Sequence, residues 1–255
     1  MRRRQACRML AALGSGLAWM PQAAPAAEPD EARLIAGATT FYCEAAEGGG
    51  VTGLACELVL ELARRAGHSG AVDLYPFARA LAVTAAASHT LLVPVGRTPA
   101  RESRYRWIVP LLEDDFLVVT KRASTLDISS FEALRDVSVG MVRDGVGAQL
   151  SAAHGLRHVN IVTDDLTNAK KLEAGRIDAW FSSWNGICAA QRAAGLSVDG
   201  LRRGVVGSHV QVYLVGSLDT APAVVARWRA AFETMRADGS YAAILRKYQV
   251  DPPKP

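Results

Sequence analysis

Arginine side chains after predicted strands are the groups best suited to bind a charged small molecule. Arg97 follows the apolar run at 91–95, and Arg79 follows the segment 75–78 at the end of another predicted strand. Arg101 comes four residues after Arg97. A guanidinium presents a planar fork of N–H donors that matches the two oxygens of a carboxylate. Each arginine could instead be an ordinary surface residue, so both interpretations stay open at this point.

A second contact to an anion is expected at the turn formed by Asp144, Gly145, Val146 and Gly147. The residues after this turn predict a helix, and the first turn of a helix leaves backbone N–H groups unpaired. These N–H groups, together with the positive end of the helix dipole, favour a bound anion. The alternative is a plain strand-to-helix turn with no ligand.

Four aromatic residues lie where predicted strands end. Phe41 and Tyr42 end the first strand, and Tyr75 and Trp184 end later ones. Each could form a wall of a binding pocket or pack in the core.

The elements that must position these residues alternate between short β-rich runs and helical patterns. Strands are predicted at 33–42, 91–95, 138–142, 159–162, 178–182 and 210–215, and helices at 53–66, 76–87, 145–154, 165–174, 185–194 and around 224–235. This alternation predicts an α/β protein with open, mostly parallel sheets and helices on both sides.

Two extended segments, 116–121 and 209–217, are predicted to cross between two lobes. The first lobe comprises 28–117 with 212–255, and the second comprises 118–211. Ligands in such sheets bind in the crevice beyond the carboxyl ends of the strands. The sequence therefore predicts a cleft between the lobes as the place for a ligand.

The N-terminal residues 1–26 have the layout of a secretory signal. Arginines come first, an apolar stretch of about a dozen residues follows, and an A-x-A cleavage site lies at 24–26. Four of the 29 basic residues lie in this segment, which leaves 25 basic against 25 acidic residues. A neutral mature chain gives no support for nucleic-acid binding. We expect an exported, soluble, periplasmic protein.

Three cysteines follow the predicted signal: Cys43, Cys56 and Cys188. Cys43 and Cys56 could form a disulfide in an oxidising compartment, or all three could be small buried hydrophobic residues. Their spacing fits no zinc site, and no phosphate-binding loop, metalloprotease motif or serine-hydrolase motif occurs. We therefore expect no metal and no cofactor.

The segment 96–102 resembles the T-x-x-R motif of the bacterial extracellular solute-binding proteins of family 3, the periplasmic receptors of polar amino-acid ABC importers. Further similar segments follow the same order as in that family. They lie at 53–54, 105–110, 139–142, 172–179 and 239–248.

The resemblance implies a two-lobe type II periplasmic-binding fold that closes on its ligand by a hinge. It also implies that Arg101 pairs with the ligand carboxylate and that the turn at Gly145 gives backbone donors. Val146 lacks the hydroxyl that the family carries there. Ser183 stands where the family's amino-acid receptors have an aspartate for the ligand's ammonium. The ligand is thus expected to be a carboxylate, with its amino group in question.

A binding protein of this kind is expected to be a monomer. Its partners would be a small-molecule carboxylate and, if it serves transport, ABC permease subunits. One alternative is a periplasmic sensor that is not coupled to transport. Another is an enzyme that resembles cyclohexadienyl dehydratase and has the same fold. Its candidate acids and bases are Glu44, Glu102, Asp144 and His209.

Overall fold

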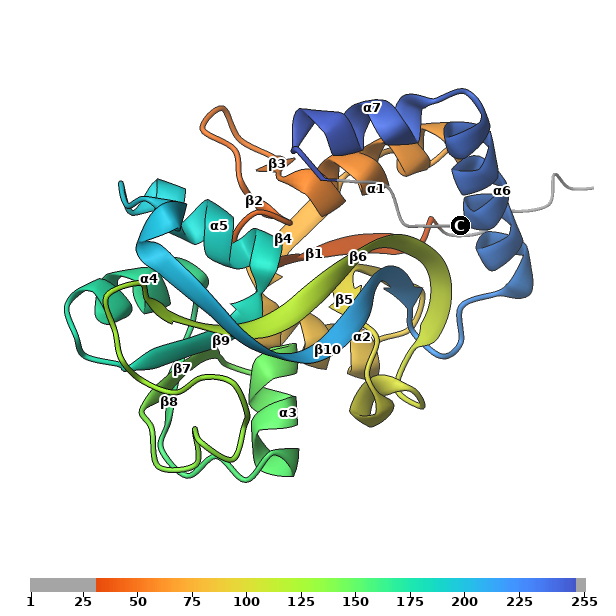
Figure 1. The fold of residues 1–255 in the computed structure, drawn as a ribbon. Helices are drawn as coiled ribbons and strands as arrows, with labels where there is room; N and C mark the ends of the chain where they lie inside the picture. Colours follow the sequence, from red (N-terminus) through yellow and green to blue (C-terminus); the bar gives the residue numbers. More distant parts are fainter. Residues whose placement is uncertain (1–30, 251–255) are drawn as a thin grey trace, which may run out of the picture. The chain divides into compact units, whose positions relative to one another are not determined.

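The computed structural model describes residues 31–250, whose strands form one eight-stranded sheet and a small two-stranded hairpin (Figure 1). The predicted signal at 1–26 lies outside the described residues. In chain order the elements are β1 (Arg33–Ala38), β2 (Glu44–Ala45), β3 (Val51–Thr52), α1 (Leu54–Arg65), β4 (Val72–Pro76), α2 (Phe77–Ala86), β5 (Thr90–Gly96), η1 (Pro99–Arg101), β6 (Arg106–Lys121), β7 (Val139–Val142), α3 (Val146–Ala153), β8 (Val159–Val162), α4 (Asp165–Glu173), β9 (Ala179–Ser183), α5 (Trp184–Ala193), η2 (Val198–Gly200), β10 (Leu201–Gly216), α6 (Pro222–Ala237) and α7 (Ser240–Lys247).

The large sheet is continuous, with the strand order β4-β1-β5-β10-β6-β9-β7-β8. Its outer strands pair in parallel, and the long central strands β6 and β10 pair antiparallel with each other and with their neighbours. The sequence predicted separate sheets linked by two crossover segments. Those segments lie within β6 and β10, which are each 16 residues long and join the two ends into one sheet.

Proline and glycine residues interrupt the strand pattern in the sequence, so these two strands were predicted too short. Pro110 interrupts the pattern of β6, but it lies where β6 pairs with β10 alone, beyond the stretch that pairs with β9. Gly204 and Gly207 interrupt β10 because neighbouring groups come close. A Cβ atom at Gly207 would lie 2.6 Å from the ring of Phe181. Glycine inside a strand often marks such an approach.

The first strand is shorter than predicted. β1 ends at Ala38, and Thr39 to Tyr42 form a turn in which Phe41 has a positive φ of 76°. Cys43 follows this turn and is disulfide-bonded to Cys56 on α1. The disulfide therefore fastens the turn to the first helix.

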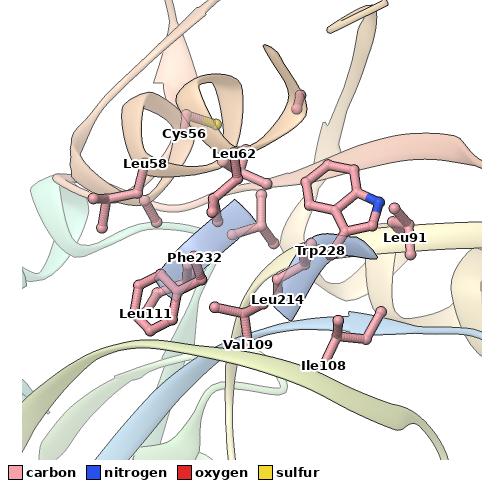
Figure 2. Close-up of a cluster of buried hydrophobic side chains, with 14 of the residues drawn as sticks. Cys56, Leu58, Leu62, Leu91, Ile108, Val109, Leu111, Leu214, Trp228 and Phe232 are labelled. Atoms are coloured by element: carbon pink, nitrogen blue, oxygen red, sulfur yellow. The ribbon is translucent and has the colours of Figure 1, made fainter. Parts of the chain in front are cut away.

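Helices α1 and α6 cover one face of the sheet by a shared hydrophobic cluster (Figure 2). Leu58 and Leu62 of α1 meet Trp228 and Phe232 of α6, and all four side chains are 6% exposed or less. Four-residue spacing places each pair on one side of its helix. Burying each of these side chains stabilises the fold by about 1.5–3 kcal/mol.

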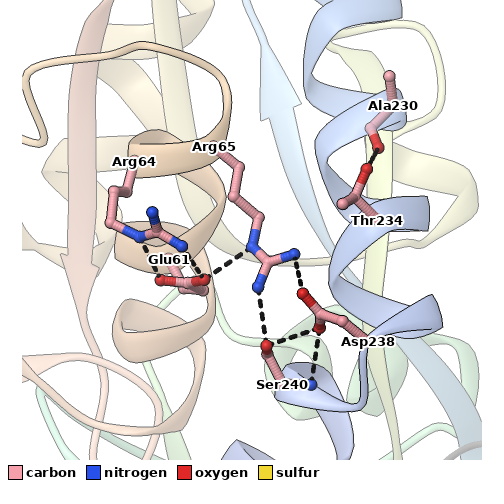
Figure 3. Close-up of polar contacts among 7 residues, drawn as sticks. All are labelled: Glu61, Arg64, Arg65, Ala230, Thr234, Asp238 and Ser240. Carbon is pink, nitrogen blue, oxygen red and sulfur yellow. Dashed lines mark hydrogen bonds and ion pairs between the residues drawn. The ribbon is translucent and has the colours of Figure 1, made fainter.

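Arg65 connects the end of α1 to the segment between α6 and α7 (Figure 3). Its guanidinium donates to Glu61 at 2.7 Å, to Asp238 at 2.6 Å and to Ser240 at 2.7 Å. Hydrogen bonds from Arg65 and Ser240 hold the pKa of Asp238 below its usual range. These contacts fix the C-terminal helices against the first one.

The buried hydrophobic residues fall into two groups along the chain. Two clusters draw on 34–112 and 212–245, and two others draw on 117–201. The boundaries of the predicted lobes stay a prediction. Within residues 31–250, no helix is long and apolar enough to cross a membrane.

Candidate ligand-binding site

Residues from both predicted lobes line a cavity of about 60 Å³. A single water needs about 10–15 Å³, so the cavity has room for a small polar group. The wall is mostly apolar, with a few polar side chains among apolar ones. It consists of Thr39, Tyr42, Phe77, Pro94, Gly96, Arg101, Phe116, Val142, Gly145, Val146, Asp165, Ser182, Ser183 and Val212.

Arg101 is the cation in this wall, and it is only 1% exposed. The short helix η1 carries it directly after β5. Its guanidinium donates to the carbonyl oxygens of Gly96 at 2.9 Å and Asp144 at 2.5 Å. Burial lowers the pKa of Arg101 to about 10. The guanidinium therefore keeps its charge at neutral pH, although burial disfavours that charge.

No ion pair within residues 31–250 includes Arg101. A buried charge without a counter-ion is costly. The position of this guanidinium in a cavity wall therefore favours an anion as its missing partner.

Gln149 is a neighbour of Arg101 that the sequence did not suggest. With its amide oxygen turned toward Arg101, Gln149 accepts from two guanidinium nitrogens at 3.2 Å and donates to the Thr98 hydroxyl at 2.8 Å. Gln149 lies on α3, whereas Thr98 and Arg101 lie after β5. These contacts join the two predicted lobes beside the cavity. No local pattern marks Gln149, because its role depends on this contact alone.

The predicted turn at 144–147 meets the cavity through only some of its residues. Gly145 is the N-cap of α3, and both Gly145 and Val146 line the wall. Asp144 has a φ of 54° and contributes its carbonyl oxygen, which accepts from Arg101. Gly147 packs against Phe181 instead, because a Cβ atom there would lie 2.8 Å from the Phe181 carbonyl oxygen.

Close packing brings this turn against β5. A Cβ atom at Gly96 would lie 2.9 Å from the side chain of Val146 and 3.7 Å from the guanidinium of Arg101. Any ligand larger than the present cavity therefore requires β5 and α3 to move apart.

A second polar region of the wall is built around Tyr42. The Tyr42 hydroxyl donates to the carboxylate of Asp114 and lies 3.2 Å from the hydroxyl of Ser183. Burial raises the pKa of Asp114 to about 6. Burial and the charge of Asp114 raise the pKa of Tyr42 well above its usual value. Tyr42 therefore keeps its proton and donates it to Asp114.

Asp165 is a second buried carboxylate in the same region. It accepts from Trp180 at 2.9 Å, from Ser182 at 2.9 Å and from Asn168 at 3.4 Å. Burial raises its pKa, and these donors act in the opposite direction. Like Asp114, it takes part in none of the ion pairs among residues 31–250.

Neither carboxylate was predicted as part of a site. Asp165 follows Asp164, which caps α4 by accepting from the Thr167 N–H at 2.8 Å. An acid in the first turn of a helix is common for reasons of helix stability alone. Asp114 stands in the acidic run 113–115, which is typical of a surface. Their burial is visible only in the folded chain.

Arg97 does not line this cavity, and its predicted role in ligand binding stays a prediction. Its guanidinium pairs with Glu102 at 2.6 Å and donates to the Tyr213 hydroxyl at 3.3 Å. It lies with Trp107 and Arg229 in a separate surface depression. The residues after a strand do not all face the crevice, and the side chain of Arg97 lies on the side away from this cavity.

Four further predicted residues also lie outside the cavity wall, and their role in ligand binding stays a prediction. Arg79 stacks over the ring of Tyr75 at 4.7 Å, and the Tyr75 hydroxyl accepts from Arg33 at 2.5 Å. Trp184 lies under the guanidinium of Arg203 at 4.5 Å. Phe41 packs edge-on against Tyr42 and Tyr248, with ring centroids 5.2 and 5.8 Å apart.

The disulfide positions Tyr42 from the adjacent residue. Cys43 is fully buried and bonded to Cys56, while Cys188 is a buried free thiol. Gly53 also fixes this turn: it has a φ of 104°, and a Cβ atom there would lie 2.7 Å from the Tyr42 carbonyl group. The sequence left the pairing of Cys43 and Cys56 open.

The acids and bases considered for an enzyme do not gather at the cavity. Glu44 accepts from the backbone of Phe41 at 3.2 Å, Glu102 pairs with Arg97, and the exposed His209 pairs with Asp115. Within residues 31–250, no group of three or more potential metal ligands lies together.

Comparison of the fold with solved structures finds many similar proteins, whereas a scan against protein-family models and a search of curated proteins both found no match. A histidine kinase sensor domain with similarity to periplasmic binding proteins has a TM-score of 0.78 and 17% identity, over 86% of this chain and 97% of that one. A histidine-bound ABC substrate-binding protein from Streptococcus pneumoniae has a TM-score of 0.74 and 18% identity, over 85% and 91%. A variant of ArgBP from T. maritima has a TM-score of 0.73 and 16% identity, over 85% and 94%.

The chain therefore has the α/β fold of periplasmic solute-binding proteins. The fold agrees with the resemblance to family 3 that the sequence motifs indicated. The structures similar to this chain include substrate-binding proteins of amino-acid ABC transporters.

Proposed function

We propose that this protein is an exported solute-binding protein that captures a small carboxylate-bearing solute, an amino acid or a related organic acid. The observation that carries the proposal is Arg101, a buried guanidinium in a cavity wall that forms no ion pair with an acid among residues 31–250. A carboxylate supplies the missing charge and matches the fork of N–H donors. The N-terminus of α3 at Gly145 and Val146 lies in the same wall and favours the same charge.

Delivery to an ABC importer is the role we propose for the captured solute. Similar structures that serve ABC uptake, one of them with bound histidine, support this role through the shared fold. The predicted signal at 1–26 supports export, and we propose that the protein acts in the periplasm as a monomeric receptor.

A sensor that is not coupled to transport is the second candidate. Its support is the similarity to a histidine kinase sensor domain, which has a TM-score of 0.78. The binding chemistry at Arg101 would be the same in both roles. Whether permease and ATPase genes lie beside the gene for this chain distinguishes them.

We further propose that the protein binds its ligand without turnover. Three of the four acids and bases that a dehydratase-like reaction could use have side chains paired elsewhere, in contacts with Phe41, Arg97 and Asp115. Release of unchanged solute, measured by mass spectrometry after incubation, tests this point. A dehydrated product would contradict it.

The decisive experiment combines native mass spectrometry of the purified protein with thermal unfolding in a panel of small acids. We expect a co-purified or added carboxylate to raise the melting temperature. Arg101→Ala should abolish the increase, and Arg101→Lys should keep only part of it, because an ammonium lacks the planar fork.

Arg104→Ala is the matched control, since Arg104 is exposed three residues away. It should respond to ligand as the unaltered protein does. Far-UV circular dichroism establishes that the Arg101 variants fold. If no carboxylate stabilises the protein, or if folded Arg101→Ala responds fully, the proposed function is wrong.

A further inference from the structure

Two serine hydroxyls in the cavity wall are each backed by a buried carboxylate. Ser183 connects through Tyr42 to Asp114, and Ser182 connects directly to Asp165 at 2.9 Å. Both serines line the cavity and are 6% exposed or less. The direction of these hydrogen bonds decides what the wall offers to a ligand.

The single proton of Tyr42 determines the direction of the hydrogen-bond chain that links Ser183, Tyr42 and Asp114. A phenol has one proton, and Tyr42 donates it to Asp114. The 3.2 Å contact between the oxygens of Tyr42 and Ser183 must therefore use the proton of Ser183. Ser183 also accepts from the Gly186 N–H at 3.2 Å, as the N-cap of α5. Its proton points away from the cavity, and one lone pair remains for a ligand.

The second chain has the same direction. Ser182 donates its proton to Asp165, so its oxygen also remains an acceptor. Asp114 and Asp165 have no cationic partner among residues 31–250. Neither acid forms an ion pair with Arg101, whose guanidinium contacts Gly96, Asp144 and Gln149 instead. The wall thus has a cationic region and a separate acceptor region.

We propose that Asp114 is a positioning residue that acts through Tyr42 and Ser183 and, together with Asp165 and Ser182, makes this region select a hydrogen-bond donor on the ligand, most strongly a cationic amine. The inference rests on the proposed function, because it concerns the second group of a ligand whose carboxylate binds Arg101. In this arrangement the ligand contacts the Ser183 hydroxyl, and the carboxylate of Asp114 acts on it indirectly.

Protonation of Asp114 reverses the first chain. A protonated carboxyl donates to Tyr42, Tyr42 then donates to Ser183, and Ser183 turns its own proton toward the cavity. The region then disfavours a hydrogen-bond donor on the ligand and instead donates to a carbonyl or carboxylate oxygen. The charged and titratable groups around Asp114 are Tyr42, Asp165 through Tyr42, the adjacent Asp115 with His209, and Cys188 with Arg192 and Arg203 beside it. Burial raises the pKa of Asp114 to about 6, so the reversal falls in an accessible pH range.

Asp114→Asn imposes the reversed direction at every pH. The Asp115 N–H donates to Oδ1 of Asp114 at 2.8 Å and would hold the amide oxygen at that place. The amide nitrogen then faces Tyr42 and donates to it. The probes are butyrate, α-hydroxybutyrate and α-aminobutyrate, which share a carbon skeleton and differ in the donor on the α carbon.

Isothermal titration calorimetry at about pH 8 should show α-aminobutyrate as the tightest binder, then α-hydroxybutyrate, then butyrate. Asp114→Asn should weaken α-aminobutyrate by about tenfold or more, since a hydrogen bond to a charged group is lost, and should leave butyrate unchanged or tighter. In the unaltered protein, the preference for α-aminobutyrate over butyrate should shrink as the pH falls through about 6.

Asp115→Asn is the matched control, because it removes the same charge from the adjacent, more exposed carboxylate that pairs with His209. It should leave the order of the probes unchanged. Tyr42→Phe interrupts the chain without a change of charge and should also flatten the order, which gives a second test if Asp114→Asn folds poorly.

Arg101→Ala separates the two proposals. If it abolishes binding of all three acids while Asp114→Asn and Tyr42→Phe leave their order unchanged, the proposed function stands and this inference is overturned. Equal affinity of the unaltered protein for butyrate and α-aminobutyrate also overturns it. If Arg101→Ala binds as well as the unaltered protein, the carboxylate site is wrong whatever the Asp114 variants do.

Discussion

The guanidinium of Arg101 donates to the carbonyl oxygen of Asp144 at 2.5 Å, a contact between residues 43 positions apart in the sequence. It joins the short helix after β5 to the turn that begins α3. The same guanidinium is the group that we expect to bind the ligand carboxylate. Ligand binding and the contact between these two segments therefore depend on one side chain.

Gln149→Glu should create a substitute for the ligand inside the protein. Gln149 can place its amide oxygen 3.2 Å from two nitrogens of Arg101, so a glutamate there can form an ion pair. We expect the free protein to melt at a higher temperature and its affinity for a carboxylate to fall by about tenfold or more, because the guanidinium is already paired. Calorimetry and thermal unfolding measure both effects.

Gln149→Met is the control for that prediction, because it keeps the length of the side chain without a carboxylate. It should retain carboxylate binding. An unchanged affinity in Gln149→Glu would show that the ligand does not need Arg101.

Asp114→Asn should change how stability depends on pH. The pKa of Asp114 is raised to about 6 in the folded protein, so the folded state binds more protons than the unfolded state between about pH 4 and 6. The free energy of unfolding therefore falls as the pH rises through this range. Relative to the variant, the unaltered protein should lose about 2 kcal/mol between about pH 4.5 and 7.5.

Urea denaturation at the two pH values measures this difference. Because the other acids titrate equally in both proteins, their contributions cancel in the comparison. A difference that stays constant with pH would mean that Asp114 titrates in its ordinary range.

Loss of the disulfide between Cys43 and Cys56 should destabilise the protein by about 3 kcal/mol, as expected for a closed loop of this size. The bond follows Tyr42 directly, so the double variant Cys43→Ser with Cys56→Ser should also bind ligand more weakly. Chemical denaturation with and without a reductant measures the effect.

The double variant serves as its own control for the reductant. The reductant should lower the stability of the unaltered protein to that of the variant and leave the variant unchanged. Equal stability of all samples would contradict a structural role for the bond.

The order of strands and helices could be predicted from local patterns in the sequence. The helix predicted at 53–66 matches α1, which spans Leu54–Arg65, and alternation of elements predicted the α/β class. These signals are local because helix and strand periodicity repeats within a few residues. The lengths of β6 and β10 could not be predicted, since their paired residues lie between 80 (Leu201 with Lys121) and 110 (Gly216 with Arg106) positions apart in the chain.

The candidate site was only partly predictable for the same reason. The cavity wall contains the predicted Arg101, Tyr42, Gly145, Val146 and Ser183. It does not contain Arg97, which lies four residues from Arg101 and pairs with Glu102. Sequence spacing alone does not distinguish these two arginines.

The sequence by itself determined the class of fold, the position of a candidate anion-binding arginine, and the doubt about an ammonium site at Ser183. Only the tertiary structure decided what surrounds that serine. Pairing of β6 with β9 places Phe116 opposite Ser183, and Asp114, two residues before Phe116, reaches Ser183 through Tyr42 from the turn after β1. Burial and hydrogen-bond direction arise from contacts among segments distant in the chain, and these two properties give the carboxylates of Asp114 and Asp165 their chemistry.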